Sequence, residues 1–140
     1  MPRTLLALTV ALAAALTASS VGTAATRPFT VHDLVAMERI SDPQVSPDGR
    51  QVAFVVTVMD LDANRGRRDL HLAAVDGSQS RRLTTAEASD TSPRWLDADT
   101  LLFLSGRSGS DQVWRLEHAG GEAERVTDLP LDVAALEVGP

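Results

Sequence analysis

The sequence has no cysteine, no tyrosine and no lysine, and only 4% of its 140 residues are aromatic. Without cysteine there are no disulfides, so stability must come from packing alone, and thiolate metal sites are excluded. The scarcity of aromatic residues leaves few large side chains to anchor a core. All 13 basic residues are arginine and the net charge is -6, which disfavours nucleic acid or an anionic membrane as a partner.

Residues 1–25 predict a cleavable signal peptide. Arg3 supplies a short positive region, Leu5 to Ala18 form an uncharged apolar run, and small residues then allow cleavage near Ala24 or Ala25. The run is shorter than the ~20 residues of a membrane-spanning helix. A buried N-terminal helix is the alternative interpretation. We expect export to the periplasm or beyond, with no membrane contact after cleavage.

Residues 26–42 form an N-terminal segment that contains one short predicted helix. Thr30 is placed to cap a helix over residues 29–40, and Asp33 completes a capping box three residues later. Pro43 disfavours helical geometry at the residue before it, so the helix is expected to end there.

Residues 43–140 predict strands and turns only. In the first half the expected strands are 43–46, 51–58, 69–75 and 80–84, rich in β-branched and apolar residues. The "SPDG" corner at Ser46–Gly49 predicts a reversal between two antiparallel strands, because proline presets φ and glycine tolerates a positive φ. "DGS" at residues 76–78 predicts a hairpin turn.

The strand pattern repeats along the chain. Thr84 aligned on Thr127 superimposes residues 68–84 on 111–127 without a gap, a shift of 43. Upstream, Pro43, Val45 and Phe54 correspond to Pro93, Trp95 and Phe103, at a slightly larger shift that a longer loop over residues 59–68 would explain. "LEVGP" at the end of the sequence begins a third copy.

A period in the forties with four short strands per unit is typical of β-propeller blades. The predicted fold is therefore all-β: two four-stranded antiparallel blades over residues 43–140 with the start of a third, after a signal peptide and a short helix. A propeller closes with about four to eight blades. We therefore expect this chain to be part of a longer polypeptide, or to need partner chains, and to be poorly soluble alone.

Several segments together resemble one enzyme family. These are "FTVHDLVAMERISDPQVSPDGRQVAFVV", "SRRLT", "LLFLSGRSGSDQVWRL" and "GGEAERVTDLP". The chain over residues 28–140 is similar to the N-terminal part of secreted bacterial serine peptidases of the prolyl oligopeptidase family, of the dipeptidyl aminopeptidase or acylaminoacyl-peptidase type. "SPDG" with "RRLT" is also shared by TolB-type propellers. The second copy departs from the pattern, since "LDADT" places Leu96 where serine is usual.

The resemblance implies a TolB- or dipeptidyl peptidase IV-like propeller followed by an α/β-hydrolase domain. In such proteins a serine, an aspartate and a histidine of the hydrolase domain cleave peptide bonds, and the propeller restricts access to short peptides. The partners implied are that missing domain, the remaining blades and peptide substrates. The alternative function is a non-catalytic, TolB-like periplasmic propeller that mediates protein–protein interaction.

The sequence predicts no catalytic, cofactor-binding or metal-binding residue in this chain. "GRSGS" at Gly106–Ser110 approaches the nucleophile motif G-x-S-x-G but has serine at its last position, so an interstrand loop is the better interpretation. His32, His71 and His118 are scattered and occupy different repeat positions, which favours packing or surface roles over a metal site.

Three further features have simple structural interpretations. Asp60–Gly66 has oxygen ligands at alternate positions, but its glycine is misplaced for an EF-hand, so a solvated loop is favoured. The arginines at 65, 67, 68, 81 and 82 lack interleaved aromatic residues, so nucleic-acid binding is a weak alternative to a solvated surface. Trp95 is expected in the core between blades, with ligand stacking as the minor alternative.

Overall fold

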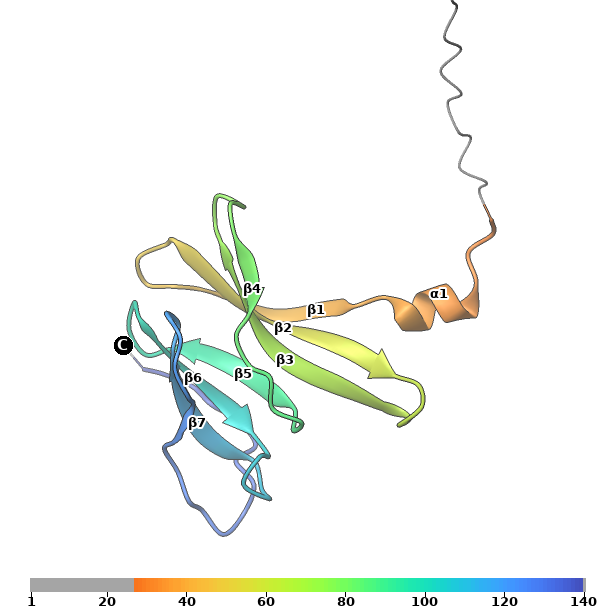
Figure 1. Ribbon diagram of the computed structural model, residues 1–140. Coiled ribbons are helices and arrows are strands. Elements are labelled where there is room, and N and C mark those ends of the chain that lie inside the picture. The colour runs from red at the N-terminus through yellow and green to blue at the C-terminus, as the bar shows by residue number, and fades with distance from the viewer. Residues whose placement is uncertain (1–26, 140) are drawn as a thin grey trace, which may run out of the picture.

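The computed structural model describes residues 27–139, so the predicted signal peptide and its cleavage site at Ala24 or Ala25 lie outside the described residues. Two four-stranded antiparallel sheets follow one short helix, as the sequence predicts (Figure 1). No helix within residues 27–139 has the length and apolar character needed to cross a membrane. The elements in chain order are α1 (Val31–Ala36), β1 (Arg39–Val45), β2 (Gln51–Asp60), β3 (Arg65–Ala74), β4 (Ser80–Arg82), β5 (Asp90–Trp95), β6 (Thr100–Ser105), β7 (Gln112–Glu117) and β8 (Glu124–Arg125).

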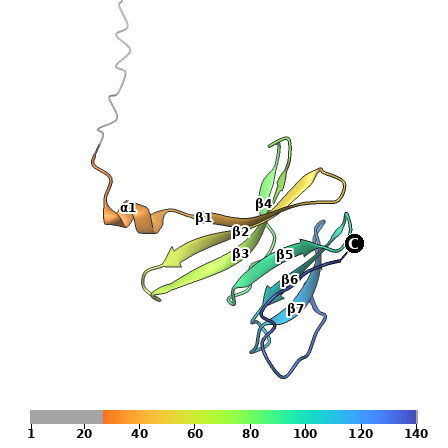
Figure 2. The same ribbon diagram turned by 180° about the vertical axis from the view of Figure 1, so that it is seen from behind.

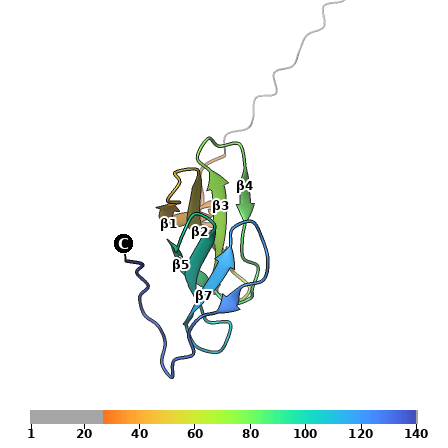
Figure 3. The same cartoon turned by 90° about the vertical axis from the view of Figure 1, so that its left-hand side faces the viewer.

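The strands of each sheet pair in sequence order, β1 to β4 in blade 1 and β5 to β8 in blade 2. Each strand therefore needs only a short turn to reach its neighbour. The two sheets lie beside each other, with β5 of blade 2 against β1, β2 and β3 of blade 1 (Figures 1 and 3). The two aligned copies are thus two separate sheets, as blades require, and do not merge into one closed barrel.

The helix begins as predicted but ends earlier. The hydroxyl of Thr30 accepts from the backbone N–H of Asp33, and the Asp33 carboxylate accepts from the backbone N–H of Thr30, which completes the capping box. The helix ends at Ala36, so the prediction of helix to residue 40 was wrong. Residues 39–41 instead pair with β2, because a strand edge offers backbone hydrogen bonds over a longer stretch than this short helix can. Helix α1 lies at one end of blade 1, where the chain enters β1, and it contacts β2 (Figure 2).

The first strand of each blade carries the same irregularity. Asp42 has a φ of 48° and Ser92 a φ of 53°, and at each of them the register between the first and second strands shifts. Each residue precedes a proline, Pro43 or Pro93, which has no N–H to donate to a ladder. Asp42 and Ser92 correspond in the sequence alignment. The structure therefore confirms the repeat, down to the position of the bulge in the first strand of each blade.

The turns follow their predicted chemistry. In "SPDG" the N–H of Gly49 donates to the Ser46 carbonyl at 2.9 Å, and Gly49 has the expected positive φ of 72°. In "LDADT" the Asp97 carboxylate accepts from the backbone N–H groups of Asp99 and Thr100, both at 2.8 Å. Asp97 therefore closes the turn although the usual serine is absent.

The first blade is longer because its strands are longer, and the prediction of a longer loop over residues 59–68 was wrong. Strands β2 and β3 have 10 residues each, against 6 each in β6 and β7. Pairing continues to Asp60 opposite Arg65, which leaves only residues 61–64 in the turn. Asn64 takes a left-handed φ of 48° there, a conformation that asparagine tolerates better than most residues.

Residues 136–139, which align with the first strand of a blade, form no strand. In both sheets the first strand takes its hydrogen-bond partners from the second strand of its own blade. Within residues 27–139 no strand pairs with residues 136–139, so the predicted start of a third copy forms no strand here. Its Glu137 carboxylate lies 3.8 Å from Arg94 on β5.

Candidate functional site: the seam between the two blades

The two blades meet in an apolar seam. We use this name for the facing side chains of Ala53, Val55, Leu70 and Leu72 in blade 1 and of Trp95, Leu101, Phe103 and Leu116 in blade 2, all buried. Burial of a side chain the size of leucine or phenylalanine contributes about 1.5–3 kcal/mol. The seam therefore holds the blades together, and the prediction that Trp95 belongs to the inter-blade core is confirmed.

Polar contacts join the first strands of the two blades. The indole N–H of Trp95 donates to the Gln44 carbonyl at 3.0 Å. The Arg94 guanidinium donates to both Asp42 carboxylate oxygens, at 3.1 and 3.0 Å, and its other end lies near Glu137. The Asp42–Arg94 pair cannot be identified from the sequence, because no local pattern shows that two residues on different blades are in contact.

A buried ion pair lies at the end of blade 2 where β5 begins and β6 ends. The Asp90 side chain is fully buried and accepts two bonds of 2.8 Å from the Arg107 guanidinium. Arg107 also donates to the Ser105 hydroxyl at 2.9 Å. Its guanidinium lies 5.3 Å from the ring centre of Phe103 and 4.9 Å from that of Trp114. The charge is thus enclosed by a carboxylate and two aromatic faces, which stabilise it.

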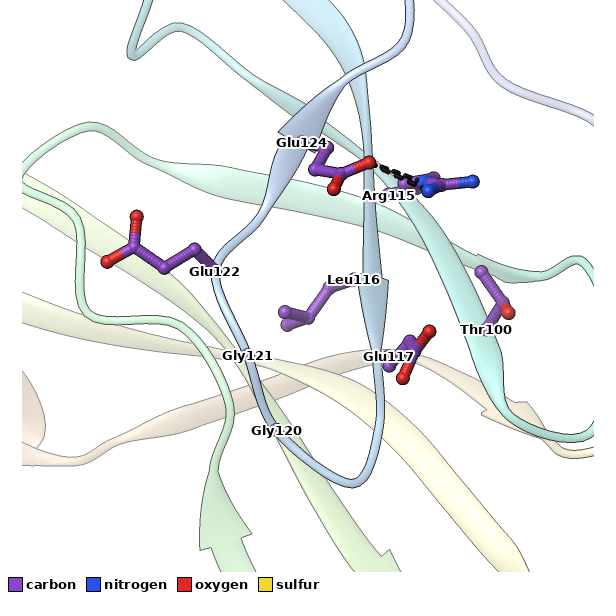
Figure 4. Close-up of a pocket in the computed structure, with 8 residues that line it drawn as sticks. All are labelled: Thr100, Arg115, Leu116, Glu117, Gly120, Gly121, Glu122 and Glu124. Carbon is purple, nitrogen blue, oxygen red and sulfur yellow. Dashed lines mark hydrogen bonds and ion pairs between the residues drawn. The ribbon is translucent and has the colours of Figure 1, made fainter.

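A hollow of about 230 Å³ opens beside β7 (Figure 4). Gly120 and Gly121, in the β7–β8 turn that lines it, have φ values of 128° and 122°, which favour glycine. Figure 4 shows the Glu122 side chain pointing away from Glu117 and Glu124, and Glu124 is already paired with Arg115 at 2.7 Å. The carboxylates therefore do not converge on a ligand.

The "GRSGS" segment lies where the sequence predicts, in the turn between β6 and β7. The N–H of Gly109 closes this turn by donating to the Gly106 carbonyl at 3.0 Å. A nucleophile elbow joins a strand to a helix, whereas this turn joins two strands. Asp60–Gly66 likewise spans the end of β2, an exposed turn and the start of β3, and the Asp60 carboxylate accepts from the Ala63 N–H at 2.9 Å.

The three histidines have different surroundings. His32 is exposed on α1. His71 on β3 lies opposite Phe54 on β2, with 5.8 Å between ring centres. His118 follows β7, and its Nε2 lies 3.5 Å from an Asp99 carboxylate oxygen. Within residues 27–139, no group of three or more histidine, aspartate or glutamate side chains is arranged to hold a metal ion.

Local hydrogen bonds and burial shift the pKa values of a few side chains. The Ser46 hydroxyl and the Arg50 N–H lower the pKa of Asp48, and the backbone N–H groups of Asp99 and Thr100 lower the pKa of Asp97. Burial lowers the pKa of His71, with Asp69 opposing that change. The lowered pKa values of Asp48 and Asp97 arise from hydrogen bonds that close turns, so they have a structural cause. His71 instead lies within strand β3 of the blade 1 sheet.

A model of the TolB β-propeller domain, PD40, matches residues 29–130. Among curated proteins, an uncharacterized peptidase YuxL of Bacillus subtilis is 32% identical over 108 residues, covering 76% of this chain and 16% of its own length. Dipeptidyl-peptidase 5 of Porphyromonas gingivalis is 30% identical over 95 residues, covering 67% of this chain and 14% of its own length. The chain thus spans less than a fifth of the length of either relative.

The fold is also similar to that of a solved propeller. The crystal structure of TolB from Acinetobacter baumannii matches with a TM-score of 0.50 and 29% identity, over 61% of this chain and 20% of that one. The all-β, propeller-like architecture and the resemblance to peptidases are both confirmed by these comparisons.

Proposed function

Because the chain belongs to the TolB β-propeller domain family, we propose that it is the N-terminal propeller portion of an exported serine peptidase that hydrolyses short peptides. In this proposal a C-terminal α/β-hydrolase domain carries the serine, aspartate and histidine of the reaction. The blades form a wall that limits access to that domain, so that short peptides enter and folded proteins do not.

One observation carries the proposal: both curated relatives described above are named as peptidases, and this chain corresponds to only 16% and 14% of their lengths. Proteins of that size have room for further blades and a catalytic domain. The assignment of the chemistry to that domain agrees with the place of "GRSGS" between two strands, which is the wrong setting for a nucleophile.

The surface of the N-terminal segment supports a longer polypeptide. Helix α1 buries none of its residues, and Val31, Leu34 and Met37 beside it or on it are 74%, 50% and 52% exposed. A helix of 6 residues is marginal without tertiary contacts. Further parts of the protein that cover this apolar surface would stabilise the helix.

The catalytic proposal is tested by the continuing reading frame and by activity. We expect a G-x-S-x-G motif after the last blade, followed by an aspartate and then a histidine. The full-length protein should cleave chromogenic dipeptide or aminoacyl substrates, and a serine-to-alanine variant of that motif should not. Cleavage of short peptides but not of folded proteins would support the gating role. Equal cleavage of both would contradict it.

Export is tested by the mature N-terminus. If cleavage occurs after Ala24 or Ala25, protein recovered from outside the cytoplasm begins at Ala25 or Thr26, which mass spectrometry identifies. Recovery of protein that still begins at Met1 would contradict export by a cleavable signal peptide.

A non-catalytic, TolB-like periplasmic propeller that binds other proteins is the second candidate. The similarity to TolB from Acinetobacter baumannii and a 30% identity to the protein TolB homolog of Chlorobium luteolum favour it. A reading frame that stops soon after the last blade, together with no peptide cleavage, would establish this function over the first.

A further inference from the structure

The outer edge of β3 is paired over only part of its length. Strand β4 pairs with residues 71–73, whereas β3 begins at Arg65. In blade 2 the corresponding strand β7 begins at Gln112, the counterpart of Asp69, so blade 2 has no equivalent of residues 65–68. Figures 1 and 2 show this end of the β2–β3 hairpin reaching beyond blade 2, with no other strand of the described chain along the outer side of β3. We call residues 65–69 on this side the open edge of β3.

The backbone groups that point outward along the open edge can be identified from Leu70. Its carbonyl accepts from the Leu83 N–H at 2.7 Å and its N–H donates to the Thr84 hydroxyl at 3.0 Å, so both groups point away from β2. Alternate residues of a strand direct their backbone groups to the same side, so those of Gly66 and Arg68 also point away from β2. Within residues 27–139, neither residue has a hydrogen-bond partner on that side. Two N–H and two C=O groups are therefore free to pair with another strand.

The side chains of the open edge are mostly basic, although the whole chain has a net charge of -6. Arg65 and Arg68 are exposed and belong to no ion pair within residues 27–139. Asp60 lies opposite Arg65 in the register of β2 and β3, but no ion pair joins them. Arg67 lies between the two free arginines and is 3.2 Å from Asp69. The edge therefore offers two positive charges beside its free backbone groups.

A second copy of this chain fits the open edge poorly. In a symmetric antiparallel pair, Gly66 or Arg68 of one copy must lie opposite Gly66 or Arg68 of the other, because only these residues direct free backbone groups outward. With Gly66 opposite Gly66, Arg67 lies opposite Arg65. With Arg68 opposite Gly66, Arg67 lies opposite Arg67, and the remaining register pairs Arg68 with itself. Like charges directly opposite each other destabilise a sheet, so the occupant must carry the opposite charge.

We propose that the open edge of β3 binds an extended acidic peptide as an additional strand. Every strand pair of both sheets is antiparallel, so the added strand is antiparallel to β3 as well. The peptide residues opposite Gly66 and Arg68 each exchange two hydrogen bonds with them. Carboxylates opposite Arg68 and Arg65 face the two free guanidinium groups, which places the acidic residues three positions apart. The inference does not depend on whether the protein is a peptidase or a non-catalytic propeller.

Gly66 leaves room for an apolar side chain between the two carboxylates of the peptide. A Cβ atom at this position would lie 3.3 Å from the Thr57 methyl group and 3.4 Å from the Met59 sulfur. A β-branched residue of the peptide opposite Gly66 can therefore contact Thr57 and Met59 across the glycine. The pattern that fits the edge is an acidic residue, any residue, an apolar residue and a second acidic residue.

The first test measures binding of a labelled peptide with blocked ends, "STEVVES", to the natural full-length protein by fluorescence anisotropy. Its glutamates lie opposite Arg68 and Arg65, and its second valine lies opposite Gly66. N-methylation of the second valine removes an N–H that bonds to β3, so binding should weaken at least about tenfold. N-methylation of the first valine is the matched control, because that N–H points away from β3, and it should leave the affinity unchanged. Equal affinity of the two methylated peptides would overturn the proposal.

The second test exchanges the charges. The variant R65E/R68E should bind "STEVVES" about three- to tenfold more weakly than wild type does, and it should bind "STKVVKS" more tightly than wild type does. The second expectation guards against a variant that has merely lost its fold. R50E, at an exposed arginine in a turn of the same blade, is the control and should bind both peptides as wild type does. A variant R65E/R68E with the peptide preference of wild type would overturn the proposal.

Hydrogen exchange in the full-length protein locates the bound strand. Without peptide, the amides of Gly66 and Arg68 should exchange faster than those of Arg67 and Asp69, which point toward β2. Saturating "STEVVES" should slow exchange at Gly66 and Arg68. Slow exchange at both residues before the peptide is added would show that another part of the protein, or a second copy, already occupies the edge, and would overturn the proposal. These measurements do not use peptidase activity, so a failure of the catalytic proposal leaves them unaffected.

Discussion

Thr84 and Thr127, at corresponding positions of the two blades, make the same hydrogen bond. The hydroxyl of Thr84 accepts from the backbone N–H of Leu70 at 3.0 Å, and that of Thr127 from the N–H of Val113 at 2.9 Å. The residue before each threonine donates its N–H to the carbonyl of the same partner, at 2.7 and 2.8 Å. Each threonine thus extends the pairing of the third and fourth strands past the last regular ladder bond.

Replacing Thr84 by valine should destabilise blade 1. The substitution keeps the shape of the side chain but leaves the Leu70 N–H without its acceptor, at a cost of about 1–3 kcal/mol. Hydrogen exchange at Leu70 measures the loss. Valine at the neighbouring exposed Thr85 is the control, and comparable exchange in both variants would argue against the role of the Thr84 hydroxyl.

Replacing Arg107 by methionine should destabilise blade 2 by about 3–5 kcal/mol, because it leaves the fully buried Asp90 carboxylate without its partner. The double variant D90N/R107M should recover part of the loss. Thermal unfolding measures both, with Met at the exposed Arg50 as control. A double variant no more stable than R107M would contradict the assignment of the loss to an unpaired carboxylate.

The Asp42–Arg94 contact between blades should show a larger coupling than an ion pair within one blade. In double-mutant cycles with D42N and R94Q, we expect about 1–2 kcal/mol, because both partners are partly buried and held by two hydrogen bonds. The exposed Arg115–Glu124 pair should give about 0.2–1 kcal/mol. Equal coupling energies in the two cycles would show that the location of an ion pair between the blades does not strengthen it.

Acid should weaken the "LDADT" turn. The folded state lowers the pKa of Asp97 below its ordinary value of 3.8, so its contribution to stability is present above that pH and is lost as the pH falls below it. The drop in melting temperature between pH 6 and pH 3 should therefore be smaller in D97N than in wild type. An unchanged drop would mean that other carboxylates account for the acid sensitivity.

Much of the fold is predictable from local patterns. Glycine and proline positions identify the turns, as at Gly49 and Gly77, and the capping box identifies the start of α1. The repeat aligns the two copies so closely that even the bulges at Asp42 and Ser92 fall at corresponding positions. Two errors have one cause: the end of α1 and the length of β2 and β3 depend on pairing with a neighbouring strand, which outweighs local preference.

The seam was predictable only in part. Trp95 could be assigned to the core between the blades, because it is a large apolar residue in a strand of the repeated pattern. Asp90 with Arg107, and Asp42 with Arg94, could not, since nothing in a strand or turn pattern identifies the partner of a charge.

The amino-acid sequence by itself determined that this chain forms two four-stranded blades, because strand alternation and turn chemistry act between near neighbours. Only the tertiary structure decided which faces are covered and which charges are paired. Those contacts join residues of different blades, such as Arg94 with Asp42, and they form only when one sheet lies against the next.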